Sequence, residues 1–229
     1  MRALSKTEIL SVWERGCNQP PVQRALLLLA AVNPEASLDS LAKLSIGQRD
    51  TRLLKLRELT FGEKFTGLTN CPVCDEKIEL AFDAAAIRPA EENEIPAELD
   101  LQIEGREVRF RLPNSGDLLA VHSSEQLLAR CLLSGGNHFA ENTIQAVSEK
   151  MSAADPMADV QLALSCSSCG HQWRSSFDIV AFFWREIAAA ARGHLRDIHT
   201  LASAYGWTES EILSLSPARR RVYLEMVNG

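Results

Sequence analysis

The chain has 229 residues, 46% of them hydrophobic and 24% charged, which is typical of a soluble globular protein with a sizeable core. No apolar run reaches the roughly 20 residues that a membrane-spanning helix needs, and the N-terminus shows no secretory signal, so we expect a cytoplasmic protein without a membrane anchor. The net charge is −6, and residues 71–165 alone carry seven basic and seventeen acidic residues, an excess that disfavours nucleic acid as a partner there.

The N-terminal region has the periodicity of helices. Ser5 is placed to cap a first helix, Pro20-Pro21 to begin a second, and Ser37 to cap a short third. A longer helix is predicted over about 48–59 and is expected to end at Gly62. Its leucines fall on one stripe, and its basic residues lie largely off that stripe. The leucines are Leu53, Leu56 and Leu59, and the basic residues are Arg49, Arg52, Lys55 and Arg57.

Two cysteine pairs are flanked by segments with the period-two alternation of β-strands. Residues 65–68 lead to Cys71-Pro-Val-Cys74, and residues 160–164 lead to Cys166-Ser-Ser-Cys169. A second alternating segment follows each pair. We therefore predict two hairpins, each with a C-x-x-C pair in its turn.

Residues 88–159, between these hairpins, are predicted to form an acidic insertion. Its first part, 88–98, is rich in glutamate and contains proline, which favours a solvated linker. The remainder is predicted to contain a β-hairpin followed by helices. These elements are strands over 99–103 and 108–112 joined through Glu104-Gly105-Arg106, helices capped by Ser115 and Ser123, a break at Gly135-Gly136 and a helix over 142–153.

A long helix is predicted over about 178–204. It carries an apolar stripe at three- and four-residue spacing, which we expect to face the core along its whole length. The stripe consists of Trp184, Ile187, Ala188, Ala191, Leu195, Ile198, Leu201 and Ala202. Thr208 and Glu211 then form a capping-box pair that predicts another helix start.

The last helix is predicted to begin at Ser216-Pro217. Its expected apolar face consists of Val222, Tyr223 and Met226. The basic run Arg219-Arg220-Arg221 is interpreted as a solvated helix face, with docking onto an acidic patch as the alternative.

The two cysteine pairs belong to an internal repeat. A single offset of 95 residues superposes both pairs and the residues that follow them. The matches are Cys71 with Cys166, Cys74 with Cys169, Ile78 with Trp173, Phe82 with Phe177 and Asp83 with Asp178. Each copy has a cysteine knuckle, a returning strand, an aromatic residue and an aspartate able to cap a helix. Such a repeat is expected of two knuckles that face each other across one ion.

Cys71, Cys74, Cys166 and Cys169 are the predicted ligands of one structural zinc ion. Two residues between cysteines let both thiolates reach one metal, and four thiolates leave no open position for water or substrate. The 91 residues between the pairs exceed the roughly 15–20 of a compact zinc ribbon, so the insertion has to leave and return at one place. Redox-active or disulfide pairs, incidental thiols, and iron in place of zinc are the alternatives.

Other residues carry weaker chemical signals. His171 could replace one sulfur ligand, but we interpret it as a solvent-facing turn residue. Cys17 and Cys131 have no cysteine nearby and are expected to be small buried residues. No serine-nucleophile motif, phosphate loop or pair of catalytic carboxylates is present, so we expect no enzymatic activity. Metal-ligand pairing is also lacking for the remaining histidines, His122, His138, His194 and His199.

These patterns predict an α+β fold that is mostly α. Helical N- and C-terminal parts are joined by a paired-knuckle, zinc-ribbon-like β element, into which a hairpin and helices are inserted. The expected regions are an N-terminal helical region (1–64), a split four-cysteine element (65–87 and 160–177), the acidic insertion (88–159) and a C-terminal helical region (178–229).

Three stretches of the chain are similar to a family of baseplate-associated proteins. They are Leu44-Ser-Ile-Gly-Gln-Arg-Asp50 with the residues that follow it to Gly62, the knuckle Cys71–Phe82, and the part from Cys166 through Trp184 to Arg219. The family occurs in contractile phage tails and phage-tail-like injection systems, and is related to the baseplate hub assembly proteins of T-even phages. The four cysteines map onto the knuckles of this family.

The resemblance implies a non-enzymatic role in building, or forming part of, a contractile baseplate. Other baseplate, hub or tail proteins are the implied partners, with no membrane and no small-molecule substrate. A permanent subunit of the particle and a transient assembly chaperone both fit. The alternative, from the cysteine pairs alone, is a zinc-ribbon nucleic-acid-binding protein, which the acidic charge balance disfavours.

Overall fold

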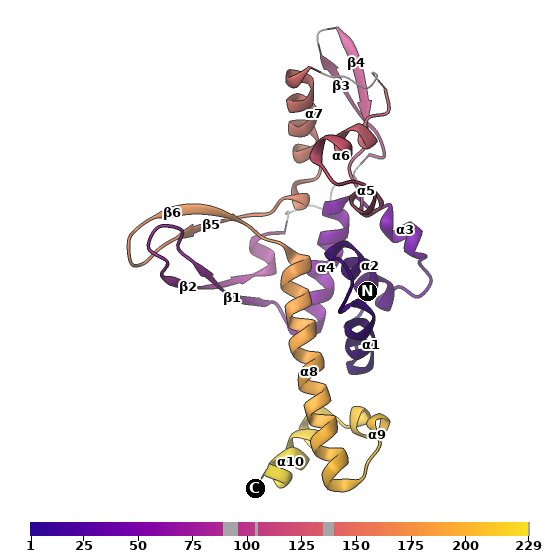
Figure 1. The fold of residues 1–229 in the computed structure, drawn as a ribbon, viewed down its shortest axis with the longest axis vertical. Coiled ribbons are helices and arrows are strands. Elements are labelled where there is room, and N and C mark those ends of the chain that lie inside the picture. The colour runs from indigo at the N-terminus through magenta and orange to yellow at the C-terminus, as the bar shows by residue number, and fades with distance from the viewer. Residues whose placement is uncertain (89–95, 104, 135–139, 229) are drawn as a thin grey trace.

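The computed structural model describes residues 1–88, 96–103, 105–134 and 140–228. Within these ranges the chain is an α+β protein, mostly helical, with small two-stranded sheets (Figure 1). The helices are α1 (Lys6–Gly16), α2 (Pro21–Val32), α3 (Leu38–Ala42), α4 (Ile46–Phe61), α5 (Ser115–Ala120), α6 (Ser124–Cys131), α7 (Glu141–Ala154), α8 (Ile179–Tyr205), α9 (Glu209–Ser214) and α10 (Pro217–Asn228). The strands are β1 (Lys64–Asn70), β2 (Lys77–Asp83), β3 (Leu99–Ile103), β4 (Arg106–Phe110), β5 (Gln161–Ser165) and β6 (Gln172–Ser176), and two 3-10 turns are η1 (Ala84–Ala86) and η2 (Pro156–Ala158).

The predicted starts of the N-terminal helices are confirmed by their caps. Ser5 and Ser37 each accept a hydrogen bond from a backbone N–H in the first turn of the following helix. The helix predicted over 48–59 begins two residues earlier, because Ser45 and Gln48 form a capping box. Gly62 ends this helix with a φ of 95°, a conformation that favours glycine.

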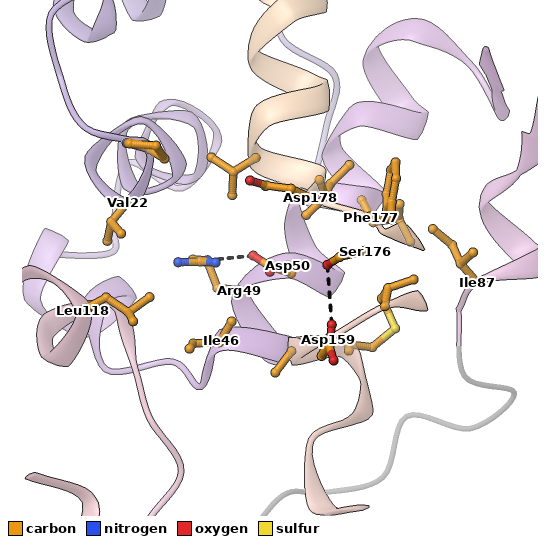
Figure 2. Close-up of a pocket in the computed structure, with 17 residues that line it drawn as sticks. Val22, Ile46, Arg49, Asp50, Ile87, Leu118, Asp159, Ser176, Phe177 and Asp178 are labelled. Carbon is orange, nitrogen blue, oxygen red and sulfur yellow. Dashed lines mark hydrogen bonds and ion pairs between the residues drawn. The ribbon is translucent and has the colours of Figure 1, made fainter. Parts of the chain in front are cut away.

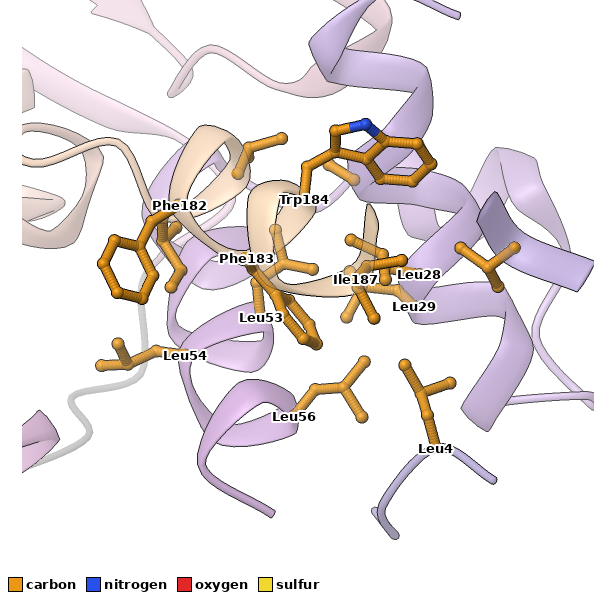
Figure 3. Close-up of a cluster of buried hydrophobic side chains, with 14 of the residues drawn as sticks. Leu4, Leu28, Leu29, Leu53, Leu54, Leu56, Phe182, Phe183, Trp184 and Ile187 are labelled. Atoms are coloured by element: carbon orange, nitrogen blue, oxygen red, sulfur yellow. The ribbon is translucent and has the colours of Figure 1, made fainter. Parts of the chain in front are cut away.

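The main hydrophobic core is built around the first half of α8, which packs against α1, α2 and α4 (Figure 3). Phe183 and Ile187 of α8 are fully buried in one cluster with Leu28 of α2 and Leu53 of α4. Burial of side chains of this size contributes about 1.5–3 kcal/mol each relative to exposure. The core therefore joins the beginning of the chain to its C-terminal part.

The predicted apolar stripe of α4 is only partly correct. Leu53 is buried as expected, but Leu59 is 40% exposed, and Leu54 packs in the core instead. Arg49 and Arg57, which were expected off the stripe, are 5% and 3% exposed. Other parts of the chain cover α4 on more than one side, so positions beyond a single stripe are enclosed. Both arginines are buried together with hydrogen-bond acceptors.

Two antiparallel hairpins, β1–β2 and β5–β6, project from the helical body as an arm (Figure 1). Both occur where the period-two segments predict them. Their registers run from Lys64 opposite Asp83 to Asn70 opposite Lys77, and from Gln161 opposite Ser176 to Ser165 opposite Gln172. Each C-x-x-C pair lies in the turn of its hairpin, at the end of the arm farthest from α8 (Figure 1).

The insertion has a small core of its own. β3 and β4 form the predicted hairpin, and Gly105 adopts a φ of 76° in its turn. Val108 and Phe110 of β4 are buried together with Val147 of α7. The strand β4 ends at Phe110 rather than continuing to 112, because Phe110 lies opposite Leu99, the first residue of β3.

Ser115 does not cap α5 as predicted. Asn114 is the cap, and its side chain accepts a hydrogen bond from the backbone N–H of Asp117. Ser115 is instead the first residue of the helix, and its buried hydroxyl lies 3.3 Å from Nη1 of Arg49. The hydroxyl group of Ser115, which was predicted to cap α5, therefore contacts Arg49 instead.

Some predictions lie outside the described residues. These are most of the linker over 88–98, Glu104 of the hairpin turn, the break at Gly135-Gly136 and His138. Among the helices of the described ranges, none combines the length and the apolar character that crossing a membrane requires.

The long helix α8 continues beyond the main core, and its apolar stripe is interrupted there. Ile187 and Ala191 are buried, but Leu195 is 37% exposed, contrary to prediction. Leu201 is again buried, together with Ile212 of α9. The interruption arises because the core covers the first half of α8, whereas α9 and α10 fold back on its far end (Figure 1).

The predicted apolar face of α10 is wrong for two of its three members. Val222 is 47% exposed and Met226 is 66% exposed. Only Tyr223 packs inward, against the rings of Tyr205 and Trp207 at centroid distances of 5.7 and 4.8 Å.

The basic run in α10 is not uniformly solvated. Arg219 and Arg221 are exposed, but Arg220 is 9% exposed and faces α8. Its Nε lies 3.4 Å from Oδ2 of Asp197. The middle arginine therefore helps to hold α10 against α8.

Candidate metal centre

The two knuckles have the same backbone hydrogen bonds. In each, the first cysteine donates across the turn and accepts from the residue four positions later. The bonds are Cys71 N–H to the carbonyl of Glu76 (2.9 Å) and Asp75 N–H to the carbonyl of Cys71 (3.0 Å), matched by Cys166 N–H to His171 (2.8 Å) and Gly170 N–H to Cys166 (3.0 Å). The sequence offset of 95 residues therefore relates the two turns in three dimensions as well.

Each knuckle contains one residue in the left-handed region. Gly170 has a φ of 74°, which glycine adopts without strain. The equivalent Asp75 has a φ of 59°, and its Oδ1 accepts a hydrogen bond from Asn70 at 2.8 Å. A side-chain hydrogen bond thus supports in one turn the conformation that glycine allows in the other.

The structure brings the four predicted cysteines together. Their sulfur atoms all lie within 4.8 Å of one another. The contacts at 3.7 Å between Cys71 and Cys169, and at 3.6 Å between Cys74 and Cys166, cross from one hairpin to the other. A tetrahedral zinc ion with bonds of about 2.3 Å separates its sulfur ligands by about 3.8 Å, whereas a disulfide needs about 2.05 Å. The spacing of these sulfurs suits one shared ion.

The surroundings of Cys71 and Cys74 shift the pKa values of these two thiols in opposite directions. Burial of Cys71 opposes its thiolate, but backbone N–H groups of Cys74 and Val73 lower its pKa to about 7. For Cys74, a backbone N–H of Glu76 favours the thiolate, but desolvation and the neighbouring sulfurs raise the pKa to about 12. Four thiolates this close repel one another unless a cation lies between them. Because all four donors are sulfur atoms, the set is suited to a soft or borderline metal such as zinc.

His171 does not belong to the group of four residues. Its ring stacks on Trp173, with centroids 5.9 Å apart and an interplanar angle of 13°, and the residue is half-buried. The imidazole of this turn residue is therefore only partly open to solvent, because the ring of Trp173 in β6 covers one of its faces.

The internal repeat continues from the knuckles to the base of the arm. Phe82 and Phe177, which the offset matches, meet edge-to-face at 5.3 Å, and both contact Phe65. The repeat ends at the aspartates. Asp178 caps α8 through its side chain, whereas Asp83 precedes only the short turn η1 and makes no such bond.

Sequence reasoning missed the residue that links the arm to the helical body. Arg57 of α4 binds Glu186 of α8 through Nε at 2.8 Å and Nη2 at 2.5 Å. Its Nη1 also donates to the carbonyls of Gly62 and Lys64 at the entrance to β1, at 2.9 and 2.8 Å. The guanidinium lies 3.9 Å from the ring centroid of Phe65. No local pattern signals this role, because Glu186 lies 129 residues along the chain.

A cavity of about 310 Å³ lies at the base of the arm and is not lined by the cysteines (Figure 2). Apolar side chains from α2, α4 and α8 form much of its wall. Arg49 and Asp50 form an ion pair in it at 2.7 Å, and Asp159 and Asp178 also line it. Burial raises the pKa of Asp50, although Arg49 opposes the shift. Among the described residues, these carboxylates do not converge as metal ligands.

The two remaining cysteines differ from each other. Cys131 is 1% exposed, as expected, and burial raises its pKa to about 11. Cys17 is exposed, contrary to prediction, because it follows the last turn of α1 at the surface. Its sulfur lies 3.3 Å from the carbonyl oxygen of Glu14.

Comparison with known proteins identifies the family. The family model described as T4 bacteriophage base plate protein matches residues 16–134, just over half of the chain. The match begins at the end of α1 and includes the first cysteine pair but not the second. No curated protein and no solved structure matches the chain. The resemblance to baseplate proteins is confirmed, and the chain belongs to the T4 bacteriophage base plate protein family.

Proposed function

We propose that the protein is a non-enzymatic structural or assembly component of a contractile, phage-tail-like baseplate, stabilised by one structural zinc ion. Cys71, Cys74, Cys166 and Cys169 would hold the ion. The observation that carries the proposal is the meeting of two C-x-x-C turns, separated by 91 residues, at sulfur distances suited to a tetrahedral ion, in a chain of the baseplate family. Four sulfur ligands leave no coordination position for a substrate, so the site is structural.

The zinc ion acts as a clamp at the end of the arm. The two hairpins share aromatic contacts at their base, but no backbone ladder joins β1–β2 to β5–β6 among the described residues. Binding of a structural zinc ion contributes on the order of 10 kcal/mol. This energy holds the two hairpins together as a zinc-ribbon-like element and fixes where the insertion leaves and returns.

We further propose that the chain is divided into four regions. The helical regions 1–64 and 178–229 share the main core, and the split element 65–87 with 160–177 forms the arm. The insertion 88–159 contains the separate cluster around Phe110. We expect the exposed arm and insertion to contact other baseplate, hub or tail proteins within the particle.

The surface of the first knuckle argues against the alternative of nucleic-acid binding. Asp75, Glu76 and Glu79 are exposed there, with Lys77 as the nearby basic residue. An acidic surface repels phosphate groups. We therefore favour protein partners.

Metal analysis of the purified chain tests the zinc proposal. We expect one zinc ion per chain, and loss of most of that zinc in Cys74→Ser and in Cys169→Ser, because each removes one ligand. Cys17→Ser is the matched control, since it removes an exposed thiol outside the cluster. A purified chain without bound metal would contradict the proposal, and stoichiometric iron would correct the identity of the ion.

Affinity purification tests the baseplate role separately. The tagged chain, expressed together with the neighbouring genes of its native operon, should recover defined baseplate or tail proteins. Recovery of no tail protein would count against the role, whatever the metal content.

A further inference from the structure

An apolar groove runs along the helical body between α2, α3 and α5. Its volume is about 570 Å³, and its walls include Leu27, Leu38 and Leu119. Leu38 is 48% exposed and Leu119 is 42% exposed, so large apolar side chains remain in contact with water. The rim carries Arg15 and Asp39. Neither of these charges forms an ion pair with another residue in the described part of the chain.

The exposed face of α10 has the complementary character. Val222 and Met226 are four residues apart, so they lie one above the other on one face of the helix. They are 47% and 66% exposed and form an apolar ridge. Arg219 and Glu225 flank this ridge, and no ion pair connects either of them to the rest of the described chain.

The ridge and the groove of one chain lie apart. The helices α3 and α5 are at the upper part of the body, whereas α10 is packed at the opposite end of α8 (Figure 1). Tyr223 and Arg220 hold α10 in that position through Trp207 and Asp197. The ridge can therefore fill the groove of another copy but not its own.

We propose that the Val222–Met226 ridge of one copy docks into the apolar groove of a second copy. The apolar ridge covers the exposed leucines of the groove, and each surface offers one charge of each sign to the other: Arg219 with Asp39, and Glu225 with Arg15. The contact is head-to-tail, since different surfaces of the two copies meet. Repetition of such a contact builds a ring if the rotation closes, or an open chain if it does not.

Sedimentation velocity of the full-length, metal-loaded protein over a wide concentration range tests this inference. The wild type should show concentration-dependent self-association. Met226→Glu on the ridge and Leu38→Glu in the groove should each weaken it by roughly tenfold or more, because each places a charge against apolar surface. Both side chains are exposed, so both variants should keep the far-UV circular dichroism of the wild type.

A mixture of the two variants gives the sharpest result. Met226→Glu retains an intact groove, and Leu38→Glu retains an intact ridge. At a concentration low enough for each variant alone to be monomeric, the mixture should therefore still form dimers with the affinity of the wild-type contact. Ile144→Glu is the control, because Ile144 is 39% exposed on α7, outside both surfaces. Its self-association should equal that of the wild type.

Three results would overturn the inference: a wild type that is monomeric at every concentration, a mixture that fails to associate, or an equal loss in Ile144→Glu. Binding of a different tail protein in the groove of a monomeric chain would also overturn it. The zinc content and the recovery of tail proteins do not depend on this contact, so its failure leaves the proposed function intact.

Discussion

Gly47, in the first turn of α4, lies directly against the side chain of Asp155 at the end of the insertion. Its N–H donates to Oδ2 of Asp155 at 2.9 Å. Asp155 is 3% exposed, and a Cβ atom at position 47 would lie 1.8 Å from its Oδ1. The first N–H groups of a helix lack partners within it and favour negative charge. The missing side chain of Gly47 therefore lets the returning insertion bind the start of α4.

Gly47→Ala should destabilise the protein by about 1–3 kcal/mol. The added methyl group displaces the buried carboxylate, and this cost exceeds the roughly 1 kcal/mol that alanine gains over glycine in a helix. Urea unfolding followed by circular dichroism measures the difference.

Gly193→Ala is the matched control for that change. Gly193 lies within α8, and a Cβ atom there would meet nothing within 4 Å. The control should therefore stabilise the protein by about 0.5–1 kcal/mol. Equal effects of the two substitutions would show that the Asp155 contact is not what requires Gly47.

Arg57→Met should lower the free energy of unfolding by about 3 kcal/mol or more. Methionine retains much of the apolar stem but leaves the carboxylate of Glu186 and the carbonyls of Gly62 and Lys64 without their donor. Thermal and urea unfolding measure the loss. Lys55→Met provides the comparison on the same helix, because Lys55 is 48% exposed in its pair with Glu58, and such pairs contribute about 0.5 kcal/mol. Similar losses in both variants would contradict a special role for Arg57.

Removal of the proposed zinc ion should loosen the arm before the helical body. Chelation takes away the link between the two knuckles, whereas the packing of α2, α4 and α8 does not involve the cysteines. Hydrogen exchange measured by mass spectrometry should show faster exchange in β1–β2 and β5–β6, with α4 little changed. Unchanged exchange in both hairpins after verified metal removal would contradict the clamp.

Asp117→Asn should remove a pH-dependent part of the stability. Asp117 is 2% exposed, and burial opposes its charge, but hydrogen bonds from Arg111, the backbone of Asn114 and Arg130 lower its pKa. A carboxylate with a lowered pKa stabilises the folded state above its unfolded pKa of about 3.9, and this contribution is lost as pH falls through the folded value. The variant should be less stable than the wild type by about 3 kcal/mol at pH 7.

The pH series for Asp117→Asn supplies its own test. Urea unfolding at pH 7, 5, 4 and 3 should show the difference between variant and wild type shrinking at the acidic end, because wild-type Asp117 then approaches the neutral state of asparagine. A constant difference at every pH would mean that the substitution acts through packing alone.

The element types were largely predictable because their signals are local. Caps such as Ser5 and the capping box of Thr208 with Glu211 act over three residues, and the alternation beside Cys71 and Cys166 acts over five. The meeting of the two knuckles was predictable for a different reason. The 95-residue repeat encodes two equivalent turns, and equivalent turns with two thiols each complete one tetrahedron only when they face each other.

The side that each helix buries was decided by the tertiary structure. Arg49 and Arg57 were predicted to lie off the apolar stripe, but α8 and the insertion cover them. Val222 and Met226 were predicted to face the core, but they are 47% and 66% exposed. Burial of these arginines depends on segments that lie 66 and 129 residues away along the chain, whereas a helical period indicates only that one face is apolar. Sequence by itself therefore determined the elements and the cysteine geometry, whereas only the folded chain decided which charges are enclosed and which apolar surfaces stay open.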